Sequence, residues 1–119
     1  MQYTQLASQR RGELRTDALA QAMYATDASI YQIPPLGVVL PRDEGDVYTT
    51  LQYVRQHGLA LTPRGGATSL AGQTIVPGLQ LDFARYMQRL LELNIEQRGA
   101  WVEPGIVLDR LNTLLAPQG

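Results

Sequence analysis

The sequence predicts an α+β fold in which a small parallel βαβ subdomain, flanked by helices, is followed by the start of an antiparallel subdomain. Two short apolar runs, residues 37–40 and 59–62, lie on either side of a helical pattern over 43–57. Strands joined through a helix by short connections favour parallel pairing, so these residues indicate a βαβ unit. Residues 91–94 and 100–103 alternate apolar with polar side chains around a short break, which indicates an antiparallel hairpin.

Composition and charge exclude several classes of protein. The 119 residues suffice for one domain with a modest core, and 45% hydrophobic with 18% charged residues is ordinary for a globular chain. A formal net charge of −1 gives no electrostatic basis for binding nucleic acid or an anionic membrane. Without cysteine the chain has no disulfide framework and no cysteine-ligated metal. No apolar run is long enough for a membrane span, and we expect a cytoplasmic location.

Residues 1–23 are predicted to form a leader followed by a helix. Residues 1–11 are polar, which is typical of a mobile leader. The apolar residues within 13–24 recur at helical spacing and predict a helix over this range. Alternatively, Thr16-Asp17 caps a shorter helix.

The next segment is predicted to be irregular. Turn-forming residues occupy 26–29, and the two prolines after Ile33 require extended backbone before them. Tyr24 and Tyr31 flank the turn, and we expect their rings to pack while their hydroxyls reach water.

The βαβ unit has recognisable ends. The continuous apolar run at 37–40 fits a strand that is buried on both faces. Asp43 can cap the following helix, and Gly58 can supply its left-handed C-terminal cap. The apolar stripe expected to face the core consists of Val47, Leu51 and Val54. His57, the only histidine, is explained by its place at the negative helix end, and no nucleophile is spaced to pair with it.

A glycine-rich stretch, Pro63–Gln73, follows the second predicted strand. Consecutive glycines let a ligand approach the main chain closely. Their amides, with the Thr68 and Ser69 hydroxyls and the charge of Arg64, can form a concave anion cradle. Open α/β sheets bind ligands at the carboxyl ends of their strands, so this position favours a diphosphate site. The spacing matches neither common phosphate loop, which leaves a plain glycine-rich turn as the alternative.

The remaining elements are a third strand, a hairpin and a last helix. Residues 79–82 read as a strand, whereas 83–89 are ambiguous between a helical turn and irregular structure. Trp101 lies on the second hairpin strand, and we expect core packing for it rather than stacking on a bound ligand. Apolar residues over 107–115 predict an amphipathic helix that ends at Pro117.

Several of these segments together resemble the flavin-linked oxidases of the vanillyl-alcohol oxidase / p-cresol methylhydroxylase type. The glycine-rich stretch resembles the pyrophosphate loop of that family, and residues 24–31, 38–42 and 101–105 resemble the segments that flank it. The likeness is closest to large bacterial D-lactate and D-2-hydroxyglutarate dehydrogenases fused to an iron–sulfur module. It implies that residues 24–119 are the truncated N-terminal part of an FAD-binding domain of the p-cresol methylhydroxylase type.

The resemblance implies cofactor-binding residues in two places. Those in the glycine-rich stretch are Arg64, Gly65, Gly66, Ala67, Thr68, Ser69, Leu70 and Gln73. Those after the hairpin are Pro104 and Gly105. The amides of 65–68, the two hydroxyls and the Gln73 side chain would bind FAD, whereas Arg64 would neutralise phosphate charge or pin the loop to an acidic neighbour. Gly105 could place an N–H near the flavin ring, although the residues themselves favour a simple strand-to-helix turn.

The resemblance also implies a function for the full-length protein. FAD would accept a hydride equivalent from a D-2-hydroxy acid, and residues 1–119 would hold the FAD diphosphate. We expect non-covalent FAD because no histidine lies near the loop, and an iron–sulfur cluster only in a C-terminal part beyond these residues. No catalytic or metal-binding residue is predicted within residues 1–119, and the oligomeric state is left open. The alternatives are a non-catalytic nucleotide- or phosphate-binding module and a structural α+β domain.

Overall fold

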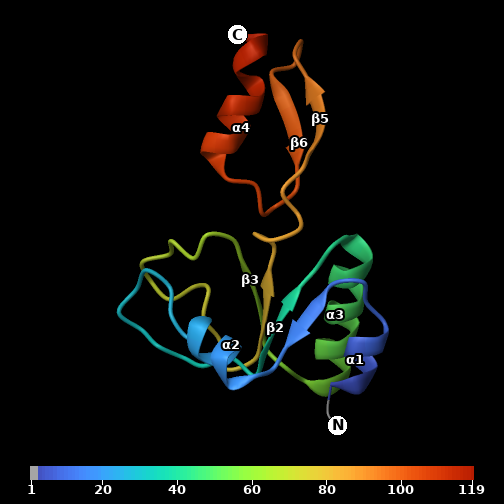
Figure 1. Cartoon of the computed structure of the whole chain (residues 1–119), viewed down its shortest axis with the longest axis vertical. Helices are drawn as coiled ribbons and strands as arrows, with labels where there is room; N and C mark the ends of the chain where they lie inside the picture. Colours follow the sequence, from blue (N-terminus) through green and yellow to red (C-terminus); the bar gives the residue numbers. More distant parts are fainter. Residues whose placement is uncertain (1–2) are drawn as a thin grey trace.

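A computed structural model describes residues 3–119, and a four-stranded sheet forms the centre of its larger lobe, residues 3–89 (Figure 1). The strand order is β1-β2-β4-β3. β1 is antiparallel to β2, whereas β2, β4 and β3 run parallel to one another. The strands are β1 (Glu13–Arg15), β2 (Gly37–Leu40), β3 (Leu61–Arg64) and β4 (Leu79–Asp82). The predicted parallel unit is therefore present, with β4 lying between the two strands that the helix connects.

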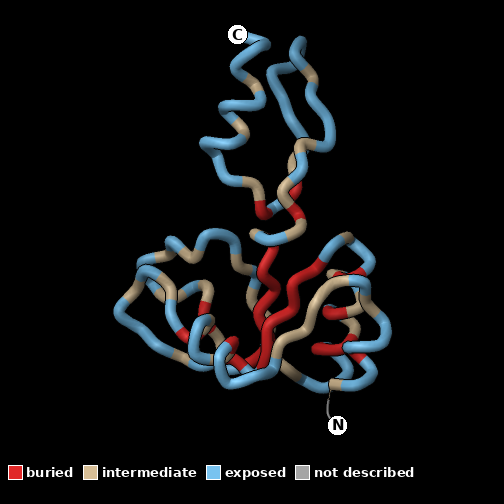
Figure 2. The backbone as a smooth tube through the Cα atoms, in the orientation of Figure 1, coloured by how far each residue is buried: buried red, intermediate tan, exposed pale blue. Residues whose placement is uncertain are grey.

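The core of this sheet lobe lies between the central strands and the longest helix (Figure 2). All four residues of β2 and of β4 are buried, as expected for strands that are covered on both faces. The helices of the lobe are α1 (Thr4–Ser8), α2 (Ala18–Met23) and α3 (Glu44–His57). The predicted ends of α3 are confirmed: Asp43 accepts the Asp46 N–H, and Gly58 has φ of 62°.

The prediction of a mobile polar leader is wrong for the described part of residues 1–11. Residues 4–8 form α1, and Leu6 is fully buried in the core beside Tyr53 and Val54 of α3. The single apolar side chain of Leu6 anchors this segment to the core, and the polar composition of the segment did not predict this. Residues 1 and 2 lie outside the described residues.

The prediction of one helix over 13–24 is also wrong, and its shorter alternative is confirmed. Residues 13–15 form β1, which pairs with the edge of β2. Helix α2 starts after Asp17, whose carboxylate accepts the Ala20 N–H at 3.0 Å. Pairing with an available sheet edge outweighs the helical periodicity of these few residues.

The apolar stripe expected along α3 is only partly correct. Val54 is buried, but Leu51 is 49% exposed. The residues of α3 that are buried are Asp46, Thr50, Tyr53 and Val54. The helix is therefore rotated so that two polar side chains face inward.

Asp46 can be buried because the main chain satisfies its carboxylate. It accepts N–H bonds from Arg11 and Gly12, each at 2.7 Å, and from Arg42 at 2.9 Å. Thr50 donates its hydroxyl to the Asp46 carbonyl oxygen. A buried carboxylate is tolerated when hydrogen bonds replace its hydration. The pattern of polar and apolar residues alone therefore predicted the wrong side of α3 to face the core.

The hairpin lobe, residues 90–119, lies at one end of the sheet lobe (Figure 1). It contains β5 (Leu90–Asn94), β6 (Gly99–Val102), α4 (Leu108–Leu115) and a 3₁₀ turn, η1 (Ala116–Gln118). The antiparallel hairpin and the last helix are confirmed, and with them the α+β class. Core packing of Trp101 is wrong, because this side chain is 72% exposed on β6. Residues 83–89, which were ambiguous, form turns that connect the lobes.

Candidate functional site

The glycine-rich loop, defined here as residues 65–78, leaves the carboxyl end of β3 and returns to β4. Strand β3 ends two residues later than expected, so Arg64 belongs to the strand. Among residues 3–119, none of the six consecutive amides from Gly65 to Leu70 donates a hydrogen bond. Main-chain amides that lack a partner bind water or a ligand. A row of such amides at a strand end is the arrangement predicted for an anion cradle.

The loop backbone takes two left-handed conformations. Ala67 has φ of 55° and Gly72 has φ of 75°. The left-handed region is unusual for alanine, and the carbonyl oxygen of Ala67 accepts the Ala28 N–H at 3.0 Å. At Gly72 a Cβ atom would lie 3.1 Å from the Tyr31 ring, so this aromatic ring packs directly on the loop.

The polar side chains of the loop differ in how far they are engaged. The Ser69 Oγ accepts the amides of Ala71 at 3.4 Å and Gln73 at 3.3 Å, which leaves its hydroxyl proton for another acceptor. The Thr68 hydroxyl has no hydrogen-bond partner within the described residues. Thr62 donates to the Gln73 carbonyl oxygen at 2.9 Å, and the Gln73 residue is exposed. Thr68, Ser69 and Gln73 thus each keep donor capacity toward a ligand.

Arg64 anchors the root of the loop on neutral groups. Its Nη1 donates to the Tyr24 carbonyl oxygen at 3.4 Å and to the Gln80 Oε1 at 3.2 Å. Its guanidinium lies 4.8 Å from the centre of the Tyr24 ring. Two roles were expected for Arg64: neutralising phosphate charge or pinning the loop to an acidic neighbour. The structure supports the pinning role, but the groups that Arg64 bonds to are neutral and not acidic.

Tyr24, Gln80 and Asp82 complete this root and were not predicted as site residues. The Tyr24 hydroxyl donates to the Asp82 Oδ2 at 2.5 Å, and the Gln80 Nε2 donates to the Tyr24 carbonyl oxygen at 2.8 Å. Burial, followed by the hydrogen bond to Asp82 and its negative charge, raises the pKa of Tyr24 to about 12. The available signal was the alternation of polar and apolar residues in β4, whose polar side chains are all buried.

The predicted residues Pro104 and Gly105 lie in the hairpin lobe and not in the loop. The Gly105 amide donates to the Met87 carbonyl oxygen at 2.8 Å. A Cβ atom at this position would lie 2.1 Å from the Phe83 carbonyl oxygen. The N–H expected near the flavin ring is therefore used within the chain, and Gly105 is explained by close backbone packing. Pro104 is exposed.

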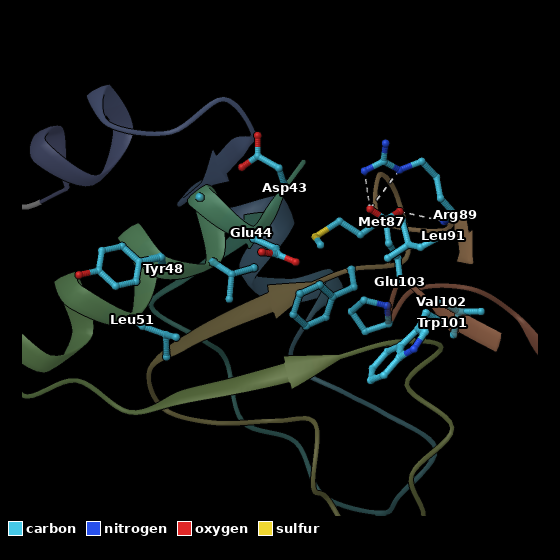
Figure 3. A pocket seen from close by; sticks show the side chains of 14 residues that line it. Asp43, Glu44, Tyr48, Leu51, Met87, Arg89, Leu91, Trp101, Val102 and Glu103 are labelled. Atoms are coloured by element: carbon cyan, nitrogen blue, oxygen red, sulfur yellow. Dashed lines mark hydrogen bonds and ion pairs between the residues drawn. The ribbon is translucent and has the colours of Figure 1, made fainter. Parts of the chain in front are cut away.

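A cavity of about 770 Å³ lies between α3 and the hairpin lobe (Figure 3). Apolar side chains dominate it, among them Leu51, Met87 and Trp101, and Pro104 is the single predicted site residue in its lining. Its buried carboxylate, Glu103, lies 2.7 Å from the Arg89 Nη2 and accepts the Arg89 N–H at 2.8 Å. The hydrogen bonds from the Arg89 side chain lower the pKa of Glu103, so this buried carboxylate is not a free base.

The remaining residues suggest no other reactive centre. The Nδ1 of His57 lies 2.8 Å from the Tyr53 carbonyl oxygen, and its ring stacks on that of Tyr53 with centroids 4.1 Å apart. His57 ends the helix that precedes β3, at the opposite end of the sheet from the loop. Within residues 3–119 there is no group of three or more His, Cys, Asp or Glu that could bind a metal ion. No helix of that region is long and apolar enough to cross a membrane.

Comparisons with known proteins support a flavin site. A family model described as an FAD binding domain matches residues 35–119. The chain is 40% identical over 112 residues to a D-2-hydroxyglutarate dehydrogenase of Pseudomonas putida, covering 92% of this chain and 11% of that protein. It is 38% identical over 111 residues to the D-2-hydroxyglutarate dehydrogenase of Escherichia coli, covering 91% of this chain and 11% of that protein. The chain thus spans about a ninth of the length of these curated relatives.

Solved structures show the same fold. The crystal structure of 6-hydroxy-D-nicotine oxidase from Arthrobacter nicotinovorans superposes with a TM-score of 0.81 and 22% identity. The superposition covers 98% of this chain and 25% of that one. The 4-ethylphenol oxidase from Gulosibacter chungangensis gives a TM-score of 0.79 at 18% identity, over 99% of this chain and 24% of the other.

Proposed function

Because the chain belongs to the FAD binding domain family, we propose that its glycine-rich loop binds the FAD diphosphate in an enzyme that oxidises a D-2-hydroxy acid. The family supports FAD as the ligand, and the dehydrogenases described above suggest the substrate class. FAD would supply the chemistry by accepting a hydride equivalent from the alcohol carbon. The role of the described residues is to bind and orient this cofactor.

One observation carries the proposal: six consecutive amides, from Gly65 to Leu70, have no acceptor within residues 3–119. A diphosphate presents several anionic oxygens, and hydrogen bonds to charged acceptors are about twice as strong as neutral ones. The Thr68 and Ser69 hydroxyls add donors beside these amides. The residues present therefore fit an anionic diphosphate. The loop itself, residues 65–78, contains no arginine or lysine, so its amides and hydroxyls are the donors.

The role of each remaining predicted residue follows from its surroundings. Arg64 sets the position of the loop root, and its charge acts on the diphosphate from a distance. Leu70 is 80% exposed and can contribute apolar contact to the cofactor. Pro104 would contact FAD through its exposed ring, and Gly105 would act by letting the hairpin lobe approach the sheet lobe.

We also propose that residues 24–119 form the N-terminal part of the FAD-binding domain and that residues 1–23 precede it. Tyr24 belongs with the domain because its carbonyl oxygen accepts the Arg64 Nη1 at the loop root, ahead of the family match at residue 35, and β1 of the preceding segment pairs with the same sheet. Non-covalent attachment of FAD, an iron–sulfur cluster in a later part of the protein and a cytoplasmic location stay predictions. No residue of 1–119 is assigned to catalysis.

The test is flavin binding by the natural full-length polypeptide. Purified protein should show the absorption bands of bound FAD, and Gly66→Trp should abolish them while circular dichroism stays unchanged. Thr113→Val is the matched control, because Thr113 is an exposed threonine on α4, away from the loop. A colourless wild-type protein that binds ATP would instead support the nucleotide-binding module, and one that binds neither would support a structural domain.

A further inference from the structure

A segment that precedes the family match holds the glycine-rich loop at three points. We call Tyr24–Ala28 the strap. The carbonyl oxygen of its first residue accepts the Arg64 Nη1 at 3.4 Å. The amide of its last residue donates to the Ala67 carbonyl oxygen at 3.0 Å. Between them, Asp27 Oδ2 accepts the Thr74 hydroxyl at 3.0 Å. The strap therefore contacts the loop at its root, at its left-handed alanine and on its returning side.

Asp27 is the side chain that organises these contacts. Its Oδ1 accepts the Ser29 N–H at 2.8 Å, so the carboxylate bonds both to the residue that follows the strap and to the loop. The hydrogen bonds from Ser29, with a smaller contribution from Thr74, lower the pKa of Asp27 below its ordinary value. The carboxylate is therefore ionised at neutral pH and acts as an acceptor for both partners.

The loop needs such support because its own contacts are few. Ala67 has a φ that side-chain-bearing residues rarely adopt, and the amides around it are bonded to nothing within residues 3–119. A loop that must be ordered when its ligand binds loses affinity through the entropy of ordering. Contacts that order the loop beforehand remove this cost. A carboxylate beside an anion site opposes binding electrostatically, so its hydrogen bonds must supply the benefit.

We infer that the strap pre-organises the glycine-rich loop for the FAD diphosphate, with Asp27 and Thr74 as positioning residues. The choice of ligand rests on the proposed function, whereas the control of loop conformation does not. The strap lies outside the FAD binding domain match, which begins at residue 35. The cofactor site thus extends into a segment that the family match leaves unassigned.

Loop order in the absence of cofactor gives the first test, on the natural full-length polypeptide stripped of FAD. The measurement is the rate of tryptic cleavage between Arg64 and Gly65, identified by mass spectrometry. Asp27→Ala and Thr74→Val should each accelerate this cleavage about tenfold, because opening of the loop exposes the bond. Thr74→Ser keeps the hydroxyl and should cleave at the wild-type rate.

FAD affinity gives the second test, measured by the change in flavin fluorescence on titration. Asp27→Ala and Thr74→Val should each raise the dissociation constant about tenfold, and the double variant should be no weaker than the weaker single one. Asp27→Asn retains an acceptor for Ser29, and its amide can donate to the Thr74 oxygen. Because it also removes a negative charge near the diphosphate, this variant should bind FAD at least as tightly as wild type.

The outcomes separate the two proposals. Faster cleavage in Asp27→Ala with a wild-type protein that binds no FAD would retain loop control and reject the flavin site. Unchanged cleavage and unchanged FAD affinity in Asp27→Ala and Thr74→Val would overturn the strap while the flavin site stands. A lowered melting temperature with both readouts unchanged would show that Asp27 is merely structural. Thr113→Val, whose hydroxyl bonds to the Asp109 carbonyl oxygen on α4, should alter neither readout.

Discussion

Gly66 in the glycine-rich loop and Gly105 in the hairpin lobe differ in what surrounds them. The nearest atom to a Cβ added at Gly66 is the Thr68 Cγ2 at 3.7 Å. A Cβ at Gly105 would lie 2.1 Å from the Phe83 carbonyl oxygen and 2.6 Å from that of Met87. The Gly105 amide is bonded to Met87, whereas the Gly66 amide has no partner within residues 3–119. Absence of a side chain thus serves backbone packing at one position and access to the backbone at the other.

The largest effect is expected for Gly105→Ala on stability. The added Cβ overlaps two backbone carbonyls, so the chain must move and the hydrogen bond to Met87 is lost. We expect the free energy of unfolding to fall by about 3 kcal/mol or more, measured by urea denaturation. Gly66→Ala is the matched control and should change it by less than about 0.5 kcal/mol. Equal losses at both positions would remove the distinction between the two glycines.

FAD affinity, unlike stability, should respond more strongly to substitution at Gly66 than at Gly105. Gly66→Trp places a large side chain over the unbonded amides, and we expect FAD affinity to fall by about 100-fold or more, about 2.7 kcal/mol. Stability should be little changed, because the nearest atom to an added Cβ is the Thr68 Cγ2 at 3.7 Å, an ordinary van der Waals distance. Isothermal titration of apoprotein with FAD measures this effect in the full-length polypeptide. Wild-type affinity in Gly66→Trp would mean that the free amides do not face the diphosphate.

The comparison also shows what the sequence could predict. A continuous apolar run identified β2, and capping residues identified both ends of α3, because these signals act locally. The sequence also predicted that the glycine-rich loop follows the carboxyl end of a strand, and parallel topology places such strand ends together at one edge of the sheet. The family resemblance suggested that Gly105 serves a ligand, and sequence alone does not show whether its amide is already bonded.

The remaining errors have a common physical origin in contacts between distant segments. Leu6 is buried because α3 lies beside it, and Asp46 is buried because three amides from two other segments reach its carboxylate. Trp101 was expected in a core, yet no described element covers it. The root of the site joins Tyr24 to Asp82, 58 residues away, which no local pattern reveals.

A moderate effect is expected for Thr68→Val, which keeps the shape of the side chain and removes its hydroxyl. The Thr68 hydroxyl has no partner among the described residues, so its loss leaves no protein group unsatisfied. We expect FAD to bind about five- to tenfold more weakly, about 1–1.4 kcal/mol, which is the net contribution of one typical hydrogen bond. Titration calorimetry and thermal unfolding of the apoprotein separate the two effects. An unchanged FAD affinity in Thr68→Val would mean that only the main-chain amides bind the diphosphate. Gly66→Trp tests the contribution of those amides independently.

The smallest effect concerns the root beneath the loop, where the pKa of Tyr24 is raised to about 12 from its ordinary value of 10.0. The folded protein holds this proton more tightly than the unfolded chain, so the stabilisation is complete below pH 10 and is lost as pH rises toward 12. Two pKa units correspond to at most about 2.7 kcal/mol, and partial solvent exposure of Tyr24 reduces the expected loss to about 1 kcal/mol.

Urea denaturation of wild type and Tyr24→Phe between pH 9 and pH 12 isolates this contribution. The difference between the two proteins cancels other tyrosines, including Tyr53, whose pKa is raised by burial. At pH 9, Tyr24→Phe should have a lower free energy of unfolding than wild type. As pH rises toward 12 the free energy of unfolding should fall less in Tyr24→Phe than in wild type. Parallel curves would mean that the Asp82 hydrogen bond does not hold the tyrosine proton. In that case the loop root would depend on the side chains of Arg64 and Gln80, which donate to the Tyr24 carbonyl oxygen.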